Sequence, residues 1–195
     1  MPWEKAFDMD MALDQATSVF AKKGFEATSL SDLTQAMQIN KGSLYNAFGS
    51  KKELFDRALA RYDQQNRAAR LAELRQWDDP KAAIEALFQG LIDSAEADPS
   101  RLGCFVINTA QDMPNQSDAV NALIRQSLEQ IETFFCDMIA AGQASGRIEP
   151  SIDPQQTAKG LLSLFVGMRV LSRGGVDLRS FDAIKSSAMQ LLPAP

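Results

Sequence analysis

Apolar residues recur along most of this chain at the three- and four-residue spacing of a helix that buries one side. The first such stretch covers residues 8–23 and ends at Gly24, a common stop signal. Within this stretch Ala16, Val19 and Phe20 lie on one side of the helix. No stretch alternates polar and β-branched residues over the length of a strand. The pattern therefore predicts an all-α protein.

Periodicity, capping residues and helix breakers together predict about nine helices. They cover residues 8–23, 29–37, 41–48, 50–75, 80–97, 103–112, 117–144, 154–172 and 180–192. The eighth of these helices carries apolar side chains on nearly every side, so we expect it to be buried. We expect one side of it to meet a second subunit, and the alternative is a central core helix in a monomer.

The composition argues against an enzyme. The chain has 195 residues, 45% of them hydrophobic, which is enough for a substantial core in one domain or in a small and a larger unit. It has no histidine, the commonest general base and transition-metal ligand, and no glycine-rich phosphate-binding motif. The spacing of Cys104 and Cys136 suits neither a disulfide framework nor a zinc site. We expect two buried thiols, no catalytic residue, no metal and no cofactor.

The N-terminal residues mix charges of both signs and lack the apolar core of a secretory signal. No apolar run reaches the length that spans a bilayer. We therefore expect a cytoplasmic protein without a membrane partner.

The charge is acidic overall but basic in one place. The net charge is −5, which by itself argues against a nucleic-acid-binding protein. Between residues 40 and 61, however, five cations stand against two anions. The cations are Lys41, Lys51, Lys52, Arg57 and Arg61. Since local charge decides where an anion binds, this stretch is a candidate contact for nucleic acid.

The first three predicted helices have the lengths and the turn of a helix-turn-helix unit. In the third helix only Leu44 and Phe48 are placed to face inward. The outward residues are Lys41, Gly42, Ser43, Tyr45 and Asn46, mostly uncharged hydrogen-bonding groups that suit phosphates and base edges. The glycine costs helix stability, about 1 kcal/mol against alanine, and would allow close approach of another molecule. The alternative is a plain surface helix.

These residues carry a resemblance to a known family. The stretch from Thr28 to Leu54, TSLSDLTQAMQINKGSLYNAFGSKKEL, resembles the DNA-binding head of the TetR family of transcriptional regulators. The family pattern K-G-x-L-Y-x-x-F matches residues 41–48, and the following s-K-x-x-L matches residues 50–54. One departure is the turn at residues 38–40, where Gln-Ile-Asn replaces the more usual Gly-Val-Ser.

The resemblance implies a double-stranded DNA operator as partner and a DNA-binding domain in residues 1–50. It implies phosphate contacts for Thr28, Tyr45 and Lys51. It implies major-groove positions for four residues of the third helix, which are Lys41, Gly42, Ser43 and Asn46. Lys52 is a weaker candidate for a phosphate contact.

The resemblance also implies that residues 51–195 bind a small-molecule effector and form a homodimer. Aromatic residues mixed with a few polar ones are typical of small-molecule pockets. On that basis the predicted pocket residues are Phe88, Phe105, Asn108, Thr109, Phe134, Phe135 and Met138, and the alternative for each is an ordinary core position. The predicted dimer interface, a four-helix bundle, contains Leu161, Leu164, Phe165, Met168, Phe181, Ile184, Ala188 and Leu191.

The leading hypothesis is therefore a repressor that a small molecule releases from a palindromic operator. A first alternative is a thiol-based redox or electrophile sensor on the same scaffold, because Cys104 lies near a helix N-terminus and beside Arg101. A second is a DNA-binding protein without a ligand, and a third is a helical enzyme whose head merely resembles a helix-turn-helix.

Overall fold

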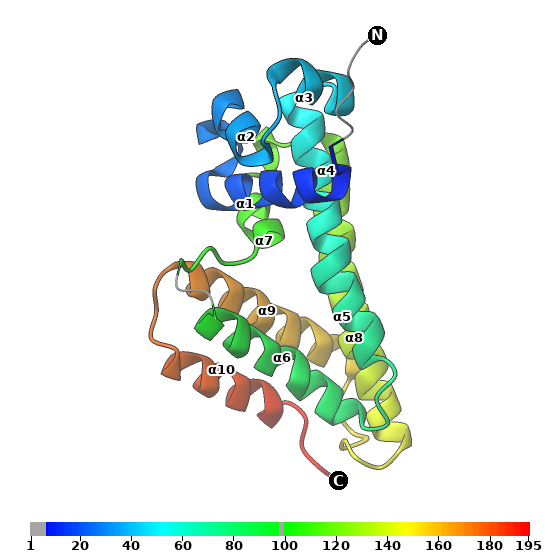
Figure 1. The fold of residues 1–195 in the computed structure, drawn as a ribbon. Coiled ribbons are helices and arrows are strands. Elements are labelled where there is room, and N and C mark those ends of the chain that lie inside the picture. Colours follow the sequence, from blue (N-terminus) through cyan, green and yellow to red (C-terminus); the bar gives the residue numbers. More distant parts are fainter. Residues whose placement is uncertain (1–6, 98–99) are drawn as a thin grey trace.

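The computed structural model describes residues 7–97 and 100–195, and every regular element in these two ranges is helical, as the apolar spacing predicts. Figure 1 shows α1–α3 as a head above a body of longer helices. The elements are α1 (Met9–Ala27), α2 (Leu30–Met37), α3 (Lys41–Phe48), α4 (Lys51–Asp63), η1 (Gln64–Ala68), α5 (Ala69–Leu74), α6 (Pro80–Ala97), α7 (Phe105–Ala110), η2 (Met113–Asn115), α8 (Asp118–Ala144), α9 (Pro154–Arg173) and α10 (Arg179–Gln190).

The helix predicted for residues 50–75 is present as one rod built from α4, η1 and α5. Residues at both junctions keep right-handed helical backbone angles, so the axis is not interrupted. The middle segment, η1, is wound as a π-helix. Such wide turns are rare within α-helices and recur at functional sites. The rod and α8 run together from the head into the body (Figure 1).

Two other helices differ from their predicted bounds. α1 bends where the stop signal was predicted, since Gly24 has φ 78° and ψ 172°, but the chain then makes a further helical turn to Ala27. The helix predicted for residues 103–112 is the shorter α7, because Gly103 takes a left-handed angle before it and the 3₁₀ turn η2 follows it.

Apolar side chains form two cores. The head core contains Ala12, Ala16, Phe20, Leu33, Met37, Leu44, Phe48, Leu54, Phe55, Ala58, Leu59, Phe105, Val106, Val120 and Ile124. The body core includes Leu74, Ile84, Phe88, Phe134, Phe135, Leu161, Phe165, Met168, Phe181 and Ala188. The head core draws on the first half of α4 and on parts of α7 and α8. By packing, therefore, the head extends beyond residue 50, where the sequence predicted the domain boundary.

Charged contacts also fix α4 to the head. Arg61 of α4 donates to Asp10 at 2.9 Å and to Asp14 at 2.8 Å, both on α1. This cation is therefore engaged within the head. In the two described ranges no helix is both long enough and apolar enough to cross a membrane.

α9 is buried on one side only in the single protomer. Its other side is partly exposed, with 41% of Val170 accessible to solvent. Five of the eight residues predicted for the dimer interface are at most 5% exposed in their own subunit, which does not favour contact with a second copy, and their place in an interface stays a prediction. These five are Leu161, Phe165, Met168, Phe181 and Ala188. Leu164, Ile184 and Leu191 keep exposed surface.

Candidate nucleic-acid interface and interior cavity

The turn between α2 and α3 forms without its usual glycine. Gln38 adopts the left-handed conformation, with φ 55° and ψ 37°, that ends α2. The N–H of Ile39 then donates to the carbonyl of Thr34 at 3.1 Å, which closes the helix end. Asn40 is the N-cap residue of α3, and its Oδ1 accepts from the N–H of Ser43 at 2.8 Å. The departure from the family turn therefore leaves the helix-turn-helix geometry intact.

α3 presents the outward face that its sequence predicts. Leu44 and Phe48 are fully buried in the head core, whereas 46% of Tyr45 is exposed. Lys41, Gly42 and Asn46 are exposed, and Ser43 is half-buried. We call these five outward residues of α3 the recognition face. A Cβ on Gly42 would lie 3.2 Å from Oδ1 of Asn40, so the glycine also leaves room for the cap of its own helix.

Lys51 lies in the first turn of α4, the helix that follows α3 in the chain. Ser50 caps this helix by accepting from the N–H of Glu53 at 3.1 Å. The Lys51 ammonium lies 4.4 Å from the centre of the Phe25 ring, a cation–π contact. The ring stabilises a positive charge that the helix N-terminus alone disfavours. The first turn of α4 therefore combines free N–H groups with a full positive charge, which suits a phosphate.

Thr28 does not belong to this surface. Only 1% of it is exposed, and its hydroxyl donates to the carbonyl of Gly24 at 2.6 Å. The side chain closes the bend in α1, and its contact with a phosphate stays a prediction that this burial does not favour.

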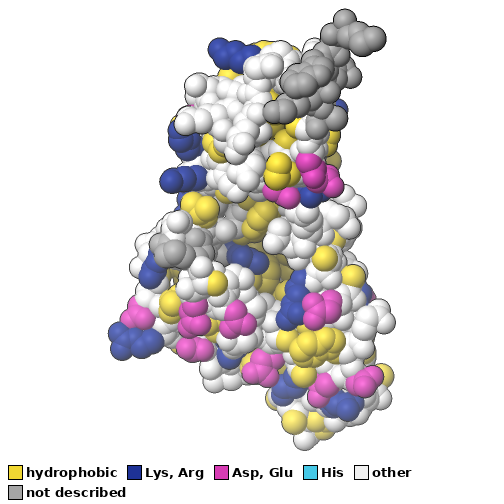
Figure 2. Space-filling model, viewed as in Figure 1, with side chains coloured by type: hydrophobic (Ala, Val, Ile, Leu, Met, Phe, Trp, Pro, Cys, Tyr) yellow, Lys and Arg dark blue, Asp and Glu magenta, His cyan; other side chains and the backbone are white. Residues whose placement is uncertain are grey.

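The remaining head cations support the local basic charge. Arg57 donates to the carbonyl of Ala47 at 3.3 Å, near the C-terminal end of α3, and Lys52 is exposed. Arg61 does not contribute, because Asp10 and Asp14 engage it. In Figure 2 most of the acidic side chains on the visible face lie on the lower part of the molecule, below the head.

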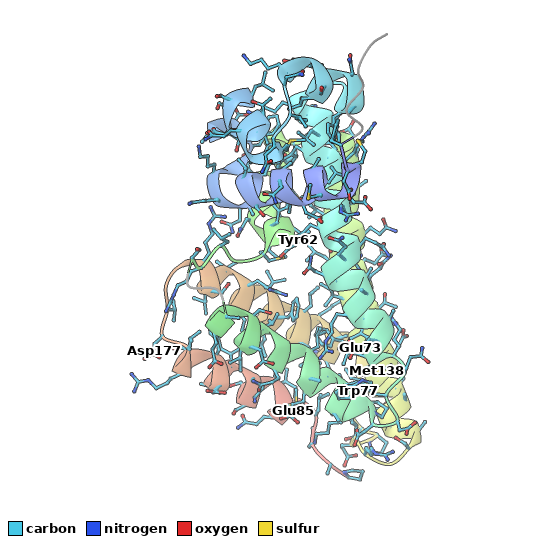
Figure 3. The ribbon with its side chains drawn as sticks, viewed as in Figure 1. Tyr62, Glu73, Trp77, Glu85, Met138 and Asp177 are labelled. Carbon is cyan, nitrogen blue, oxygen red and sulfur yellow. The ribbon has the colours of Figure 1, made fainter. Side chains whose placement is uncertain are left out.

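The seven residues predicted to form an effector pocket do not come together. Phe88, Phe134 and Phe135 are fully buried in the body core, with ring centres 5.8 Å apart in successive pairs, so they leave no space for a ligand. Met138 lies near the lower end of α8, well away from Tyr62 (Figure 3). The packing of these four residues does not favour a pocket there, and their role in one stays a prediction. Phe105, Asn108 and Thr109 line a different space, a hollow of about 400 Å³ between α1 and α7.

A smaller cavity lies where the rod meets the body, and the sequence analysis missed it. Its volume is about 60 Å³. It is lined by Tyr62, Asp63, Asn66, Arg67, Arg70, Leu71, Leu87, Cys104, Val106, Ile107, Ser127, Ile131, Phe165 and Arg169. The sequence holds one signal of it, since Arg169 is the one charged residue between Lys159 and Arg173 in the apolar α9.

Polar groups on the rod side of this cavity are mostly paired. Asp63 is buried and accepts from Arg67 at 2.7 Å and from the hydroxyl of Ser127 at 2.9 Å. Arg70 donates to Glu73 at 2.8 Å. Burial raises the pKa of Tyr62 to about 12, so its phenol is neutral and keeps its proton at ordinary pH. Tyr62 lies on α4, beside α7 (Figure 3).

Cys104 occupies the N-cap position of α7 without a capping bond from its side chain, and it lies in the cavity wall, half-buried and close to Tyr62. Arg101, three residues earlier in the sequence, donates instead to the carbonyl of Val176 at 3.0 Å. A thiol sensor at this position therefore gains no further support from the arrangement.

Comparison with known proteins identifies the family. Residues 12–58 match the bacterial regulatory proteins of the tetR family, and residues 80–184, more than half of the chain, match the tetracyclin repressor-like C-terminal domain. The chain belongs to the TetR family. This confirms the membership that the motif of α3 implied, and with it a transcriptional regulator with an N-terminal helix-turn-helix and a larger helical domain.

Comparisons with individual proteins agree with this family assignment. It is 31% identical over 194 residues to the HTH-type transcriptional repressor ComR of Escherichia coli (strain K12), covering 97% of this chain and 90% of ComR. It is 32% identical over 139 residues to the uncharacterized HTH-type transcriptional regulator YezE of Bacillus subtilis (strain 168), covering 70% and 71%. A solved structure of the TetR family transcriptional regulator CifR, a cysteine mutant complexed with 26-base-pair operator DNA, has a TM-score of 0.83 and 28% identity, covering 99% of this chain and 100% of CifR.

In this TetR-family chain a series of aromatic contacts joins the cavity to the first turn of α4. The ring of Tyr62 lies 5.8 Å from Phe105, which lies 5.4 Å from Phe55. Phe55 in turn lies 5.1 Å from Phe25, the ring that the Lys51 ammonium contacts. We call these four rings the aromatic series. It connects the two candidate sites through packed side chains.

Proposed function

We propose that this TetR-family regulator is a repressor that binds a palindromic operator as a homodimer and leaves it when a small molecule binds. The observation that carries this proposal is the recognition face, which exposes Tyr45 and Asn46 while Leu44 and Phe48 hold the helix in the head core. The acidic composition does not oppose it, because the head carries a local excess of cations between residues 40 and 61, and Arg61 engages Asp10 and Asp14 of α1.

Within the proposed interface the roles divide by chemistry. Lys51 and Tyr45 would contact phosphates, which position the protein without reading sequence. Lys41, Ser43 and Asn46 would face base edges in the major groove, with Gly42 allowing close approach. Thr28 is left out of the set because it is buried. The DNA-bound structure of CifR supports this orientation by analogy of fold and sequence.

The proposed dimer uses the outer side of α9 and α10. Leu162, Val166 and Val170 follow one another at four-residue spacing on α9 and keep exposed surface. Leu164 on α9 and Leu191, directly after α10, belong to the predicted set and also keep exposed surface. Two-fold pairing of this face would place two heads on half-sites about one DNA turn apart or somewhat more. As a member of a family of bacterial DNA-binding regulators, the protein would act in the cytoplasm.

Release would pass through the aromatic series. A ligand in the 60 Å³ cavity would contact Tyr62, and the rings of Phe105, Phe55 and Phe25 lead from that position to Lys51 in the first turn of α4. A ligand that prefers one packing of these rings shifts the population toward the matching head spacing. This is a two-state proposal, and it requires that effector and operator weaken each other's binding equally.

DNA binding by the full-length chain tests the proposal, with DNA from upstream of its own gene as the first probe. Lys51→Ala should weaken binding to operator and to unrelated DNA by the same factor, about tenfold, and lower the salt dependence by about one ion. Asn46→Ala should instead change which operator variants are preferred, by about 1–3 kcal/mol at one position.

Lys81→Ala serves as the matched control, because it removes a lysine from the body, at the start of α6. Its operator affinity should equal that of the unaltered protein. Equal losses for Lys51→Ala and Lys81→Ala, or an affinity that does not change with salt, would contradict the proposed interface.

A further inference from the structure

Three arginines line the cavity below the head, and carboxylates pair with only two of them. Arg67 is engaged by Asp63 and Arg70 by Glu73. Arg169 forms no ion pair within residues 7–97 and 100–195, and its Nε is buried without a hydrogen-bond partner. Buried polar groups are almost always satisfied in native proteins, so an orphaned arginine nitrogen needs an explanation. An anionic ligand would supply the missing acceptor.

Arg169 stands where an outer groove meets the cavity. The groove, of about 560 Å³, runs between the rod and α6 and shares Asn66, Arg70, Leu87 and Arg169 with the cavity. In Figure 2 the visible face is hollowed between the upper and the lower part of the molecule, with hydrophobic side chains inside the hollow. A molecule that occupies both the groove and the cavity would therefore contact Arg169.

The side of the cavity formed by α6, α7, α8 and α9 is largely apolar. Leu87, Ile107 and Ile131 are buried there, and Phe165 packs beneath the guanidinium, whose carbon lies 5.7 Å from the ring centre. A volume of about 60 Å³ admits only a short apolar group, since pockets that enclose a whole ligand measure some 300–1,000 Å³. The remainder of a bound molecule must lie in the groove.

We propose that the effector is a small amphipathic carboxylate whose acid group binds Arg169 and whose apolar group enters the cavity. Arginine binds a carboxylate through two parallel N–H···O bonds, which suits a planar monoanion. The neutral phenol of Tyr62, on the same cavity wall, is a second donor. The other two arginines keep their own carboxylates, so the site compensates one negative charge. This inference rests on the proposed effector-released function.

Binding to the full-length protein tests the proposal without DNA. The probes are benzoate, phenylacetate, hexanoate and octanoate, each beside its uncharged primary amide, measured by calorimetry at fixed pH and salt. At least one acid should bind at least about tenfold more tightly than its amide, since the amide lacks the charge that Arg169 pairs. Failure of all four acids to bind, or equal binding of acid and amide, would overturn the proposal.

Variants assign the charge to one residue. Arg169→Gln should weaken the acid at least about tenfold and leave amide binding unchanged, and Arg169→Lys should fall between, because lysine keeps the charge but loses the paired geometry. Arg173→Gln is the control, an exposed arginine at the end of the same helix. Circular dichroism checks that each variant is folded. An Arg169→Gln protein that binds the acid at full affinity would refute the assignment.

A separate measurement distinguishes this inference from the proposed function. Operator affinity is measured with and without the tightest acid. An acid that binds through Arg169 but leaves operator affinity unchanged would uphold the ligand site and overturn release by the effector. If the amide released the operator as readily as the acid, the inferred carboxylate effector would be wrong, whereas release of the operator by a small molecule would stand.

Discussion

The recognition face and the cavity below it are assembled from very different lengths of chain. The face comes from one short helix, and all of its outward residues lie between Lys41 and Asn46. The cavity collects side chains from the rod, α6, α7, α8 and α9. The face therefore follows from local helix geometry, whereas the cavity exists only after several helices have packed. Four changes test this difference, from the largest expected effect to the smallest.

Phe55→Ala should have the largest effect, because Phe55 is where head and cavity depend on each other. The ring is 3% exposed and contacts Phe20, Phe25 and Phe105. Its removal should lower the free energy of unfolding by about 3–5 kcal/mol. Urea denaturation followed by circular dichroism measures the change.

Met11→Ala is the control for this loss, since it removes a side chain of the head that is 59% exposed. Its effect should stay within about 0.5 kcal/mol. A Phe55→Ala loss no larger than that would mean that the head is stable without the aromatic series.

Asp63→Ala should come second, because it leaves Arg67 without its buried partner at the cavity wall. Asp63 is 7% exposed and also accepts from Ser127. The loss of unfolding free energy should be about 2–3 kcal/mol. Adding Arg67→Ala should restore part of it, because the second change removes the unpaired charge.

Glu73→Ala provides the comparison on the same rod. Its carboxylate pairs with Arg70 but is 56% exposed, so its loss should cost no more than about 0.5 kcal/mol. If the two acidic residues gave equal losses, the cavity wall would be no more tightly organised than the surface.

Gln38→Gly should raise stability slightly. The left-handed angle at Gln38 costs about 1–2 kcal/mol for a residue with a Cβ, and glycine loses about 0.5–1 kcal/mol of that gain through its greater freedom when unfolded. The net gain should be about 0.5 kcal/mol in thermal or urea unfolding. Operator affinity should not change, and a weaker affinity would mean that the glutamine side chain itself contacts DNA.

The pH dependence of the head should show the smallest effect. The hydrogen bond from Lys23, followed by bonds from Ser29, lowers the pKa of Asp32 to about 2. A depressed carboxyl pKa stabilises the folded state above about pH 4, and this contribution disappears as the pH falls toward 2. Asp32→Asn should therefore flatten part of the decline in melting temperature between pH 5 and pH 2. An unchanged decline would show that the capping contacts of α2 persist in the protonated form.

The accuracy of sequence-based prediction followed the same division. The positions of the helices depend on neighbours a few residues away, and the structure has helices in these places, although at Gly24 it has a bend and one further turn where the sequence predicted a stop. The sequence placed Phe88 and its neighbours in a ligand pocket, whereas they pack in the body core, because large aromatic residues are as suited to a core as to a ligand site. Nothing in their spacing distinguishes the two.

The chain's sequence by itself determined the helical class, the turn without glycine and the outward residues of α3. These depend on backbone preferences and side-chain spacing within single helices. Only the tertiary structure decided that Thr28 is buried, that Phe165 faces its own core and that Arg169 meets the rod without a carboxylate. The physical reason is that burial and pairing depend on which distant helices pack together. The periodicity of a helix shows which of its faces is apolar but not which helix packs against that face.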